Sequence, residues 1–462
     1  MTNINKLMFR EYDLRGRENK GELNVKSVNL IGKAYGTFLR KNSVADAVVG
    51  HDARSTSKDF HDAAIEGLRS TGVNVISCGM ILTPMMYWAQ YHFKVKGGLM
   101  VTASHNPAGW NGVKLALGYS YTLIGDELEE VYRNIVSDSY ESGSGSLKVA
   151  DIKHDYIKDL SGRVKIDRKF KIIVNTGNGT AGYLAPDLLR KVGCEIIEHN
   201  TKIDPTYPNY TPNPAEIEMM EDTSAQVLKN KCDLGFAFDG DGDRLGLVDE
   251  KGNIIPPDRY LILLSRLVLI KHPGAKIVFD VLVSNALPED IKAHGGIPIM
   301  EKTGHSYIKA RLTKEKAALA GEISGHIFFV DNFYGFDDAQ FASLRILEYL
   351  SASKKSLSEE IANTPYYIST PVLETDCPDE VKYEIVKKIT KEFEKEGAKL
   401  NTLNGVRVEY DDGWGIIRAS SNLPTLKLRF EGKSEQVIER IRGVFKAKMD
   451  KYPEIGKEWR TG

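Results

Sequence analysis

The stretch GLMVTASHNP (residues 98–107) joins a short apolar run to a loop of small and polar residues. The run at 98–102 has the length of a buried strand, and the asparagine-proline pair near the end of the stretch favours a turn. Similar apolar runs at 47–50 and 73–77 flank a segment of helical period at 60–69. This alternation predicts β-α units around mainly parallel sheets, in which ligands bind where strands end.

The α/β pattern continues through three segments of the chain and then changes. The 462 residues are enough for three or four domains of about 150 residues each. A Gly/Ser-rich stretch at 142–146 predicts a linker, and the pattern changes beyond Thr364-Pro365. We expect three mixed α/β domains with mainly parallel sheets plus a smaller C-terminal α+β domain. The expected domain boundaries are 1–150, 151–253, 254–365 and 366–462.

The composition limits the classes of partner. Lys and Arg number 62 and Asp and Glu number 63, which gives a formal net charge of −1. Such a chain has no overall field to draw it to nucleic acid or to an anionic membrane. The four cysteines are far apart in the sequence, and no stretch is apolar enough to span a bilayer. We expect a cytoplasmic protein with neither a nucleic-acid nor a membrane partner.

An acidic loop, DGDGDR (239–244), lies between two apolar runs. Its three alternating carboxylates can converge on one hard cation, whereas a merely solvated turn would leave them repelling one another. A calcium EF-hand is disfavoured because Arg244 occupies the position where that loop needs glycine. An octahedral Mg²⁺ would need a further ligand, usually a phosphoryl oxygen. The loop therefore predicts a metal and a phosphate.

Two further loops carry polar side chains that could contact a ligand. The loop after 98–102 presents Ser104, whose hydroxyl we expect to be exposed, although a hydrogen-bonded turn would explain it equally well. In GEISGH (321–326) the side chains of Glu322, Ser324 and His326 alternate, so an extended segment would project them from one face. Acceptors and donors placed in this way suit sugar hydroxyls.

Taken in order, these loops resemble the α-D-phosphohexomutase family, in its phosphomannomutase/phosphoglucomutase branch. The resemblance covers essentially the whole chain. Its motifs are FREYDLRG (9–16), TASHNP (102–107), NGVK (111–114), DGDGDR (239–244), GHS (304–306), GEISGH (321–326) and YGFDD (334–338). The resemblance implies four domains arranged around a central cleft that collects one loop from each.

The matching positions imply roles for individual residues. Ser104 is implied to be the phosphoserine, and its phosphate binds Mg²⁺ together with Asp239, Asp241 and Asp243. Charge stabilisation or proton transfer is implied for Arg15, Lys114, Arg244 and His305. Substrate binding is implied for Tyr12, Glu322, Ser324, His326, Arg418, Ser420, Ser421 and Asn422.

The resemblance also implies a reaction. The phosphoserine donates to a hexose phosphate, the 1,6-bisphosphate turns over in the cleft, and its other phosphate returns to the same serine. Mg²⁺ is the expected cofactor, with glucose 1,6-bisphosphate or an equivalent as activator. The expected partners are hexose phosphates, of mannose or glucose or both, and the protein is expected to be a monomer or a homodimer.

Two positions depart from the family pattern. Leu282 stands where the family usually has a cleft lysine, and the phosphate loop reads RASSNLP (418–424) instead of RASNTxP. Another branch of the family, phosphoglucosamine mutase, is an alternative function. Ile323 stands where that branch generally has glutamine, which disfavours this alternative. A sugar-phosphate sensor without turnover and a phosphatase remain as alternatives. We also expect a hinge near 364–367 that lets Arg418 close on phosphate.

Overall fold

The computed structural model describes residues 4–18, 20–421 and 423–461, and these divide into two compact units. One unit contains the chain up to Ile255 together with Ser324–Glu359. The other contains Pro256–Ile323 and the chain from Glu360 onward. The first unit holds two complete sheets, and the second holds three parallel strands and a complete antiparallel sheet.

The first sheet follows the strand order β1-β5-β4-β2-β3-β7, with β6 paired to β5. The pairs β4–β2, β2–β3 and β3–β7 are parallel, and β1 and β5 are antiparallel to their neighbours. Its strands are β1 (Leu14–Arg17), β2 (Asp46–His51), β3 (Asn74–Met80), β4 (Gly97–Val101), β5 (Trp110–Leu117), β6 (Tyr121–Thr122) and β7 (Leu147–Val149). The helices between them are η1 (Lys6–Met8), α1 (Val25–Lys41), α2 (Ser57–Ser70), α3 (Thr83–Phe93) and α4 (Asp126–Val136).

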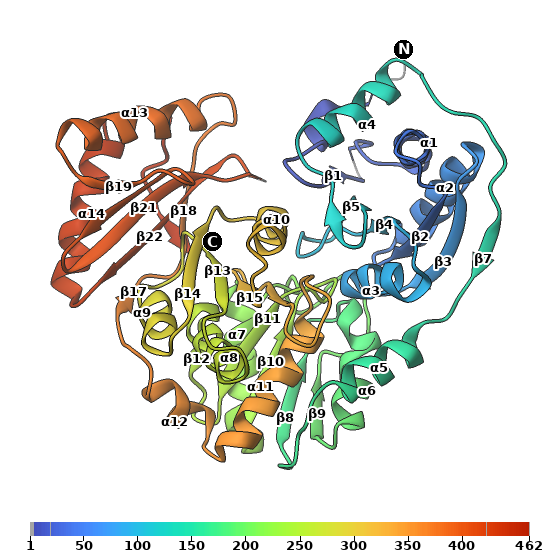
Figure 1. Cartoon of the computed structure of the whole chain (residues 1–462). Coiled ribbons are helices and arrows are strands. Elements are labelled where there is room, and N and C mark those ends of the chain that lie inside the picture. The colour runs from blue at the N-terminus through green and yellow to red at the C-terminus, as the bar shows by residue number, and fades with distance from the viewer. Residues whose placement is uncertain (1–3, 19, 422, 462) are drawn as a thin grey trace. The chain divides into compact units, whose positions relative to one another are not determined.

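Helices α1 and α2 lie side by side on one face of this sheet, and α3 lies on the other (Figure 1). Two glycines allow the close approach. A Cβ on Gly32 would lie 2.6 Å from the carbonyl oxygen of Ala64, and a Cβ on Gly67 would lie 2.3 Å from that of Asn29. Larger residues at either position would force the helices apart.

The second sheet of this unit has the order β12-β11-β10-β8-β9, in which β8, β9 and β10 are parallel and β11 and β12 antiparallel. Its strands are β8 (Lys171–Asn175), β9 (Glu195–His199), β10 (Leu234–Phe238), β11 (Leu245–Asp249) and β12 (Ile254–Ile255). The unit also contains α5 (Lys153–Gly162), η2 (Thr180–Tyr183), α6 (Ala185–Lys191), α7 (Ile217–Asn230), β16 (Ile327–Phe329) and α11 (Ala339–Ser353). Helix α11 begins where the carboxylate of Asp338 accepts the backbone N–H groups of Gln340 and Phe341.

The other unit combines a parallel sheet with an antiparallel one. The parallel strands are β13 (Lys276–Asp280), β14 (Ile297–Glu301) and β15 (Leu319–Gly321), with helices α8 (Pro257–Lys271), α9 (Ala286–Ala293) and α10 (His305–Glu315). The short helix α12 (Leu357–Ala362) precedes the antiparallel part. This part contains β17 (Ile368–Ser369), β18 (Leu373–Asp376), α13 (Lys382–Lys395), β19 (Lys399–Asn401), β20 (Val406–Tyr410), β21 (Gly413–Ala419), β22 (Thr425–Gly432), α14 (Glu435–Met449) and β23 (Arg460–Thr461).

The antiparallel sheet has two differently covered faces. Helices α13 and α14 pack on one face and form a core with Ile417, Leu428 and Phe430 (Figure 1). From the other face Trp414 and Ile416 pack against Val281 and Leu282. The four-domain α/β class expected from the sequence is therefore confirmed in its sheets: three mixed or parallel α/β sheets and a C-terminal antiparallel sheet with two helices.

The expected hinge near 364–367 stays a prediction, and this segment is hydrogen-bonded to a neighbouring helix. Arg259 on α8 donates hydrogen bonds to the carbonyl oxygen of Pro365 and to Oγ1 of Thr364, both at 2.5 Å. These bonds tie the segment to a helix of the same compact unit.

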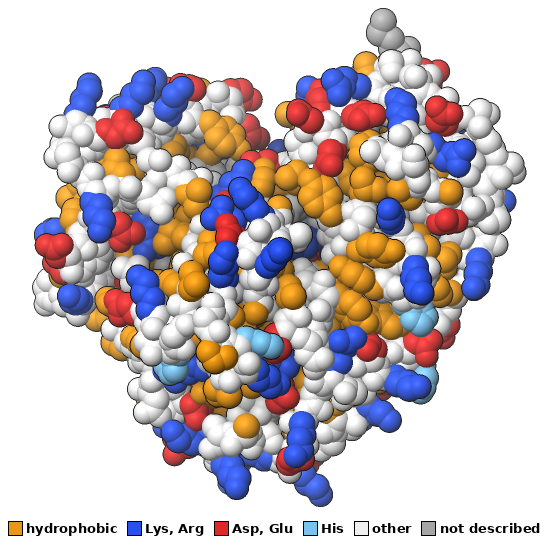
Figure 2. Space-filling model, viewed as in Figure 1, with side chains coloured by type: hydrophobic (Ala, Val, Ile, Leu, Met, Phe, Trp, Pro, Cys, Tyr) orange, Lys and Arg blue, Asp and Glu red, His pale blue; other side chains and the backbone are white. Residues whose placement is uncertain are grey.

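The surface agrees with the neutral composition. Figure 2 shows Lys and Arg side chains interspersed with Asp and Glu side chains over most of the face in view. In the described part of the chain, no helix combines the length and the apolar character that a bilayer crossing requires.

A buried arginine holds the antiparallel sheet to the segment after β13. Arg407 donates to the carbonyl oxygens of Val281 (2.7 Å) and Val283 (3.1 Å), pairs with Glu409 at 2.7 Å, and lies 3.7 Å from the ring centre of Trp414. The guanidinium thus donates hydrogen bonds to carbonyl oxygens that lie outside any strand. A buried arginine can do this because it has five donors.

We predict that Arg407→Met lowers the free energy of unfolding by about 3–5 kcal/mol, because it leaves a carboxylate and two carbonyls without their donor. Arg440→Met is the control, since Arg440 is exposed and pairs with Asp412 on the surface. Urea denaturation, followed by a signal from this unit, would measure the free energy of unfolding of both variants. Equal shifts in the two variants would contradict the prediction.

Candidate active site

The loop after β4 holds Ser104 in an unusual backbone conformation. Ser104 has φ +51°, in the left-handed region that non-glycine residues rarely adopt. Such a residue costs on the order of 1–3 kcal/mol and persists only where its surroundings fix it. The sequence pattern predicted an exposed hydroxyl, but Ser104 is buried, with 1% of its surface exposed. The burial follows from the turn, in which the backbone N–H of Ser104 donates to Oγ1 of Thr102 at 2.9 Å.

The hydroxyl of Ser104 faces an acidic group and a histidine. Its Oγ donates to Oδ2 of Asp239 at 3.2 Å and lies 3.0 Å from Nδ1 of His105. Burial, helped by the nearby Arg244 and Arg15, lowers the pKa of His105 well below its ordinary value. His105 is therefore neutral, and its ring can accept or donate at Ser104 according to its tautomer.

The acidic loop 239–244 connects β10 to β11 in an antiparallel pair. Gly242, with φ +77°, makes the turn, and the backbone N–H groups of Asp243 and Arg244 donate to Oδ1 of Asp239 at 3.0 and 3.1 Å. The carboxylates of Asp239, Asp241 and Asp243 have no exposed surface, and their ligand atoms lie within 4.8 Å of one another. The sequence prediction that these three converge is thus met in the structure.

One lysine opposes this negative charge. Nζ of Lys114, on β5, lies 2.7 Å from Asp243 and 3.3 Å from Asp241. Burial works against its charged form, but the two carboxylates raise the pKa of Lys114 well above its ordinary value. Burial, together with repulsion from Asp243 and Asp241, raises the pKa of Asp239 well above its ordinary value. The positive charge near the site is therefore too small to balance three ionised carboxylates.

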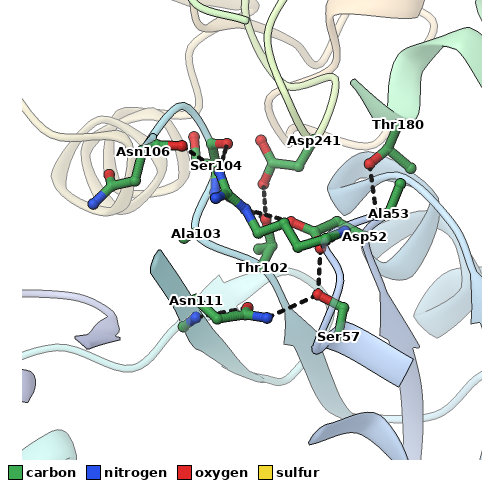
Figure 3. A network of polar contacts seen from close by, with 12 residues as sticks. Asp52, Ala53, Ser57, Thr102, Ala103, Ser104, Asn106, Asn111, Thr180 and Asp241 are labelled. Carbon is green, nitrogen blue, oxygen red and sulfur yellow. Dashed lines mark hydrogen bonds and ion pairs between the residues drawn. The ribbon is translucent and has the colours of Figure 1, made fainter. Parts of the chain in front are cut away.

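The carboxylate oxygens fit a hard cation. Oδ1 of Asp241 and Oδ1 of Asp243 are buried and accept no hydrogen bond within the described residues. The other oxygen of Asp241 accepts from Oγ1 of Thr102 at 3.2 Å (Figure 3) and from Oγ1 of Thr83 at 2.5 Å, so its orientation is fixed. Fixed, desolvated carboxylate oxygens with free lone pairs are the ligands that a divalent ion such as Mg²⁺ or Mn²⁺ prefers.

Arg15 and Arg244 border the same site. Arg15 donates to Asp13 at 2.9 Å and to the side chain of Asn106 in the serine loop. Nε of Arg244 donates to Nε2 of His326 at 3.1 Å and lies 4.0 Å from Asp239.

The bond from Arg244 also decides the tautomer of His326. Because an arginine Nε can only donate, Nε2 of His326 accepts, and its proton sits on Nδ1. That nitrogen lies 3.1 Å from a carboxylate oxygen of Asp337. Asp243, His326 and Asp337 form a second group with metal-ligand geometry. Within this group, His326 is held between Arg244 and Asp337.

The remaining predicted residues lie in the other unit or at its boundary. Glu322 accepts the backbone N–H of Gly304, at the start of α10, where His305 is the first helical residue. Leu282 packs with Trp414 and Ile416 in an apolar cluster, so a lysine at this position would be buried among apolar side chains. This packing explains the departure at Leu282 locally.

The expectation of one extended segment at 321–326 was wrong. Strand β15 ends at Gly321, and residues 323–325 form a turn in which Gly325 has φ +94°. The division between the two units falls between Ile323 and Ser324. Glu322 therefore belongs to one unit and His326 to the other, and a tight turn replaces the expected common face because glycine can adopt the left-handed conformation.

The predicted phosphate loop follows β21. Arg418 donates to the carbonyl oxygen of Ala419 at 3.1 Å, and Oγ of Ser420 accepts the N–H of Leu423 at 3.3 Å. A buried lysine that the sequence did not reveal, Lys382, donates to the carbonyl oxygens of Ser420 and Leu423 at 2.5 and 2.9 Å. Ser421 lies in the described part of this loop, and Asn422 lies outside the described residues.

Sequence reasoning missed several residues that contact the predicted ones. Thr83 binds Asp241 from the first turn of α3, Asp13 binds Arg15, and His105 adjoins Ser104. Asp13, His105 and Asp337 stand inside the quoted motifs, so their neighbourhood was a usable signal. Thr83 carried no such signal, because its contact spans 158 residues of sequence.

Four family models match consecutive parts of the chain. They describe α/β/α domains I, II and III and the C-terminal domain of phosphoglucomutase/phosphomannomutase, and they match residues 6–141, 154–252, 256–367 and 376–448. The chain belongs to the phosphoglucomutase/phosphomannomutase family. The resemblance inferred from the motifs is thereby confirmed.

Named relatives are similar over nearly their whole length. A phosphomannomutase/phosphoglucomutase of Pseudomonas syringae is 39% identical, with 96% of this chain and 95% of the relative covered. A phosphoglucomutase of Neisseria gonorrhoeae is 39% identical, with 98% and 99% covered. The crystal structure of a phosphoglucomutase/phosphomannomutase family protein from Burkholderia thailandensis superposes with a TM-score of 0.91 at 37% identity, covering 97% of this chain and 98% of that one.

We predict that Asp241→Asn removes metal binding without destabilising the metal-free protein. The variant keeps an acceptor for Thr83 but removes one of three repelling charges, so the metal-free melting temperature should stay equal or rise. Added Mg²⁺ should raise the melting temperature of the wild type and not of Asp241→Asn.

Asp249→Asn is the matched control for this experiment. Asp249 is equally buried in the same unit, but it accepts hydrogen bonds from the turn at Lys251 and Asn253. It should keep the Mg²⁺-dependent shift. A shift that survives in Asp241→Asn would show that the metal binds elsewhere.

A pH-dependent prediction concerns Asp280, at the end of β13. Burial, with repulsion from Glu322, raises its pKa from 3.8 to about 7. The folded protein therefore binds a proton that the unfolded chain has already released between about pH 4 and pH 7, and the stability contributed by this group falls as pH rises through that window. Asp280→Asn cannot ionise, so its melting temperature relative to wild type should be higher at pH 8 than at pH 5. An identical difference at both pH values would contradict the shift.

Proposed function

We propose that this chain is a phosphohexomutase that interconverts hexose 1-phosphate and hexose 6-phosphate, of glucose or mannose or both, by way of a phosphate on Ser104. The observation that carries the proposal is the contact of Ser104 Oγ with Asp239 in a buried group of three carboxylates. A hydroxyl held against a metal-binding group on a fixed turn can accept and return a phosphoryl group. The 37–39% identity to named phosphoglucomutases and phosphomannomutases supports the same conclusion.

Asp239, Asp241 and Asp243 are the proposed ligands of Mg²⁺, with an oxygen of the phosphate on Ser104 completing the set. When bound, Mg²⁺ would neutralise the charge that builds on the phosphoryl group during transfer. The protein supplies further positive charge through Lys114, which the carboxylates hold in its protonated form. Burial of the site excludes water, which would otherwise accept the phosphate and turn the mutase into a phosphatase.

The cations and histidines around the site have proposed roles in the transfer. Arg15 and Arg244 would stabilise the phosphate as it moves, because a guanidinium offers two parallel donors to phosphate oxygens. His326, whose Nδ1 proton faces Asp337, and His305 are candidates to exchange the proton of the sugar hydroxyl. Glucose 1,6-bisphosphate would load the serine and serve as activator.

Substrate recognition is assigned to several loops. We propose that Tyr12, Glu322, Ser324 and His326 contact the sugar, and that Arg418, Ser420, Ser421 and Asn422 bind the phosphate that is not being transferred. Lys382 would add charge beneath the last loop, since it binds two of its carbonyls. We further propose domain boundaries near residues 150, 253 and 365, a cytoplasmic location, and a monomer or homodimer.

The experiment is a mass measurement joined to a coupled assay. Incubation with glucose 1,6-bisphosphate should add one phosphate to the wild type, on the peptide that contains Ser104, and the protein should interconvert glucose or mannose phosphates. Ser104→Ala should take up no phosphate and lose at least about 1000-fold in kcat, because the covalent route is gone.

Ser343→Ala is the matched control, because Ser343 is fully buried in α11 of the same unit and donates only to a backbone carbonyl of its own helix. It should keep both properties. Phosphate on another residue, or near-normal turnover by Ser104→Ala, would refute the proposed route.

A further inference from the structure

The turn after β2 carries a buried arginine, Arg54, that binds much of the serine loop. A guanidinium has five N–H donors, and in Arg54 all five are engaged. Nε donates to Oδ2 of Asp52 at 3.2 Å. The two terminal nitrogens donate to the backbone carbonyl oxygens of Ser104 (2.8 Å), Asn106 (2.6 Å), Pro107 (3.0 Å) and Trp110 (3.0 Å).

We propose that Arg54 is a positioning residue for phosphoryl transfer, which holds the backbone of the serine loop so that the hydroxyl of Ser104 stays aimed at Asp239. The inference rests on the proposed function of Ser104. Arg54 is not a catalytic residue in this account, because its five donors are used by Asp52 and the four carbonyls and none is left for the hydroxyl or a phosphate.

The serine loop is irregular, and Arg54 shares the task of holding it with Arg15, which donates to the carbonyl oxygen of Ala103 and to the side chain of Asn106. Residues 102–109 belong to no helix or strand, and the backbone of Ser104 is in the left-handed region. Carbonyl groups in an irregular loop have no ladder partners, so those shielded from water, such as that of Ser104, need a side chain to satisfy them. Hydrogen bonds from a charged donor are stronger than neutral ones, and four of them converge here from one side chain.

The turn that carries Arg54 is itself fixed. Oδ1 of Asp52 accepts the backbone N–H of Arg54 at 3.0 Å and the hydroxyl of Ser57 at 2.5 Å. Asn111, on the strand that follows the serine loop, donates to Oγ of Ser57 at 2.9 Å (Figure 3). The guanidinium is therefore anchored in the sheet and does not depend on the loop for its position.

The same turn is also connected to the acidic loop. The backbone N–H of Ala53 donates to Oγ1 of Thr180 at 2.9 Å (Figure 3). The N–H of Thr180 donates in turn to the carbonyl oxygen of Gly240, also at 2.9 Å. Gly240 adjoins the serine loop so closely that a Cβ on it would lie 2.4 Å from the carbonyl oxygen of Ser104. Residues 52–54 thus set the spacing between the hydroxyl and the carboxylates.

Arg54→Lys tests the role, because lysine keeps the charge but replaces the five-donor fork by three donors on one nitrogen. A displaced nucleophile slows the transfer step and leaves ground-state binding unchanged. We expect kcat to fall about 100-fold, with the KM for glucose 1-phosphate changed by less than about threefold. In Arg54→Ala, added guanidinium ion should restore at least about tenfold of the lost rate by filling the vacated position.

Arg345→Lys is the matched control. Arg345 is equally buried in the same unit, but it pairs with Asp331 and Glu348, and neither belongs to the serine loop or the acidic loop. The Arg345→Lys variant should lower the melting temperature at least as much as Arg54→Lys does, while its kcat stays within about threefold of the wild-type value. Normal kcat in Arg54→Lys, or loss of kcat in proportion to lost stability in both variants, would overturn the proposal.

A second readout separates this inference from the proposed function. Hydrogen exchange of the amides in residues 103–110 should be faster in Arg54→Lys than in wild type and unchanged in Arg345→Lys. If wild type neither interconverts hexose phosphates nor takes phosphate on Ser104, the proposed function fails, and the exchange rates alone decide whether Arg54 positions the loop. If Arg54→Lys does not fold, Asp52→Asn must lower kcat with KM unchanged, and normal kcat in that variant would overturn the proposal.

Discussion

The carboxylates of Asp239, Asp241 and Asp243 repel one another at a buried place, where Lys114 and the more distant Arg244 oppose them. Concentrating three acidic groups in a low dielectric is costly unless cations or donors compensate. Backbone N–H groups at Asp239, hydroxyls at Asp241 and the ammonium at Asp243 supply part of that compensation. The remaining imbalance favours a bound divalent cation.

The serine faces this group from a strained turn on a neighbouring sheet. The two loops come from different sheets of one compact unit, and each follows the carboxyl end of a strand, where α/β proteins place their ligands. The hydrogen bonds made by the backbone of Ser104 offset the free-energy cost of its left-handed conformation. A fixed hydroxyl beside fixed carboxylates leaves little reorganisation for the transfer step.

Buried cations bind the backbone of three irregular segments. Arg54 serves the serine loop, Lys382 the phosphate loop, and Arg407 the segment after β13, and each donates to backbone carbonyls. A loop needs its backbone groups satisfied as much as a strand does, but it has no neighbouring strand to satisfy them. A long cationic side chain can reach such carbonyls from another element and adds positive potential near an anionic ligand.

Much of the fold and the centre of the site follow from the sequence alone. The apolar runs at 47–50 and 98–102 predicted the bounds of β2 and β4 to within one residue, and alternating carboxylates beside glycine predicted that Asp239, Asp241 and Asp243 converge. These features are encoded by neighbours in sequence, whose spacing fixes which side chains share a face. The turn at Gly325, the burial of Ser104 and the partners Arg54, Thr83 and Lys382 were decided only by tertiary structure. They depend on contacts between residues far apart in the chain, and local periodicity carries no information about which distant side chain will reach a given carbonyl or carboxylate.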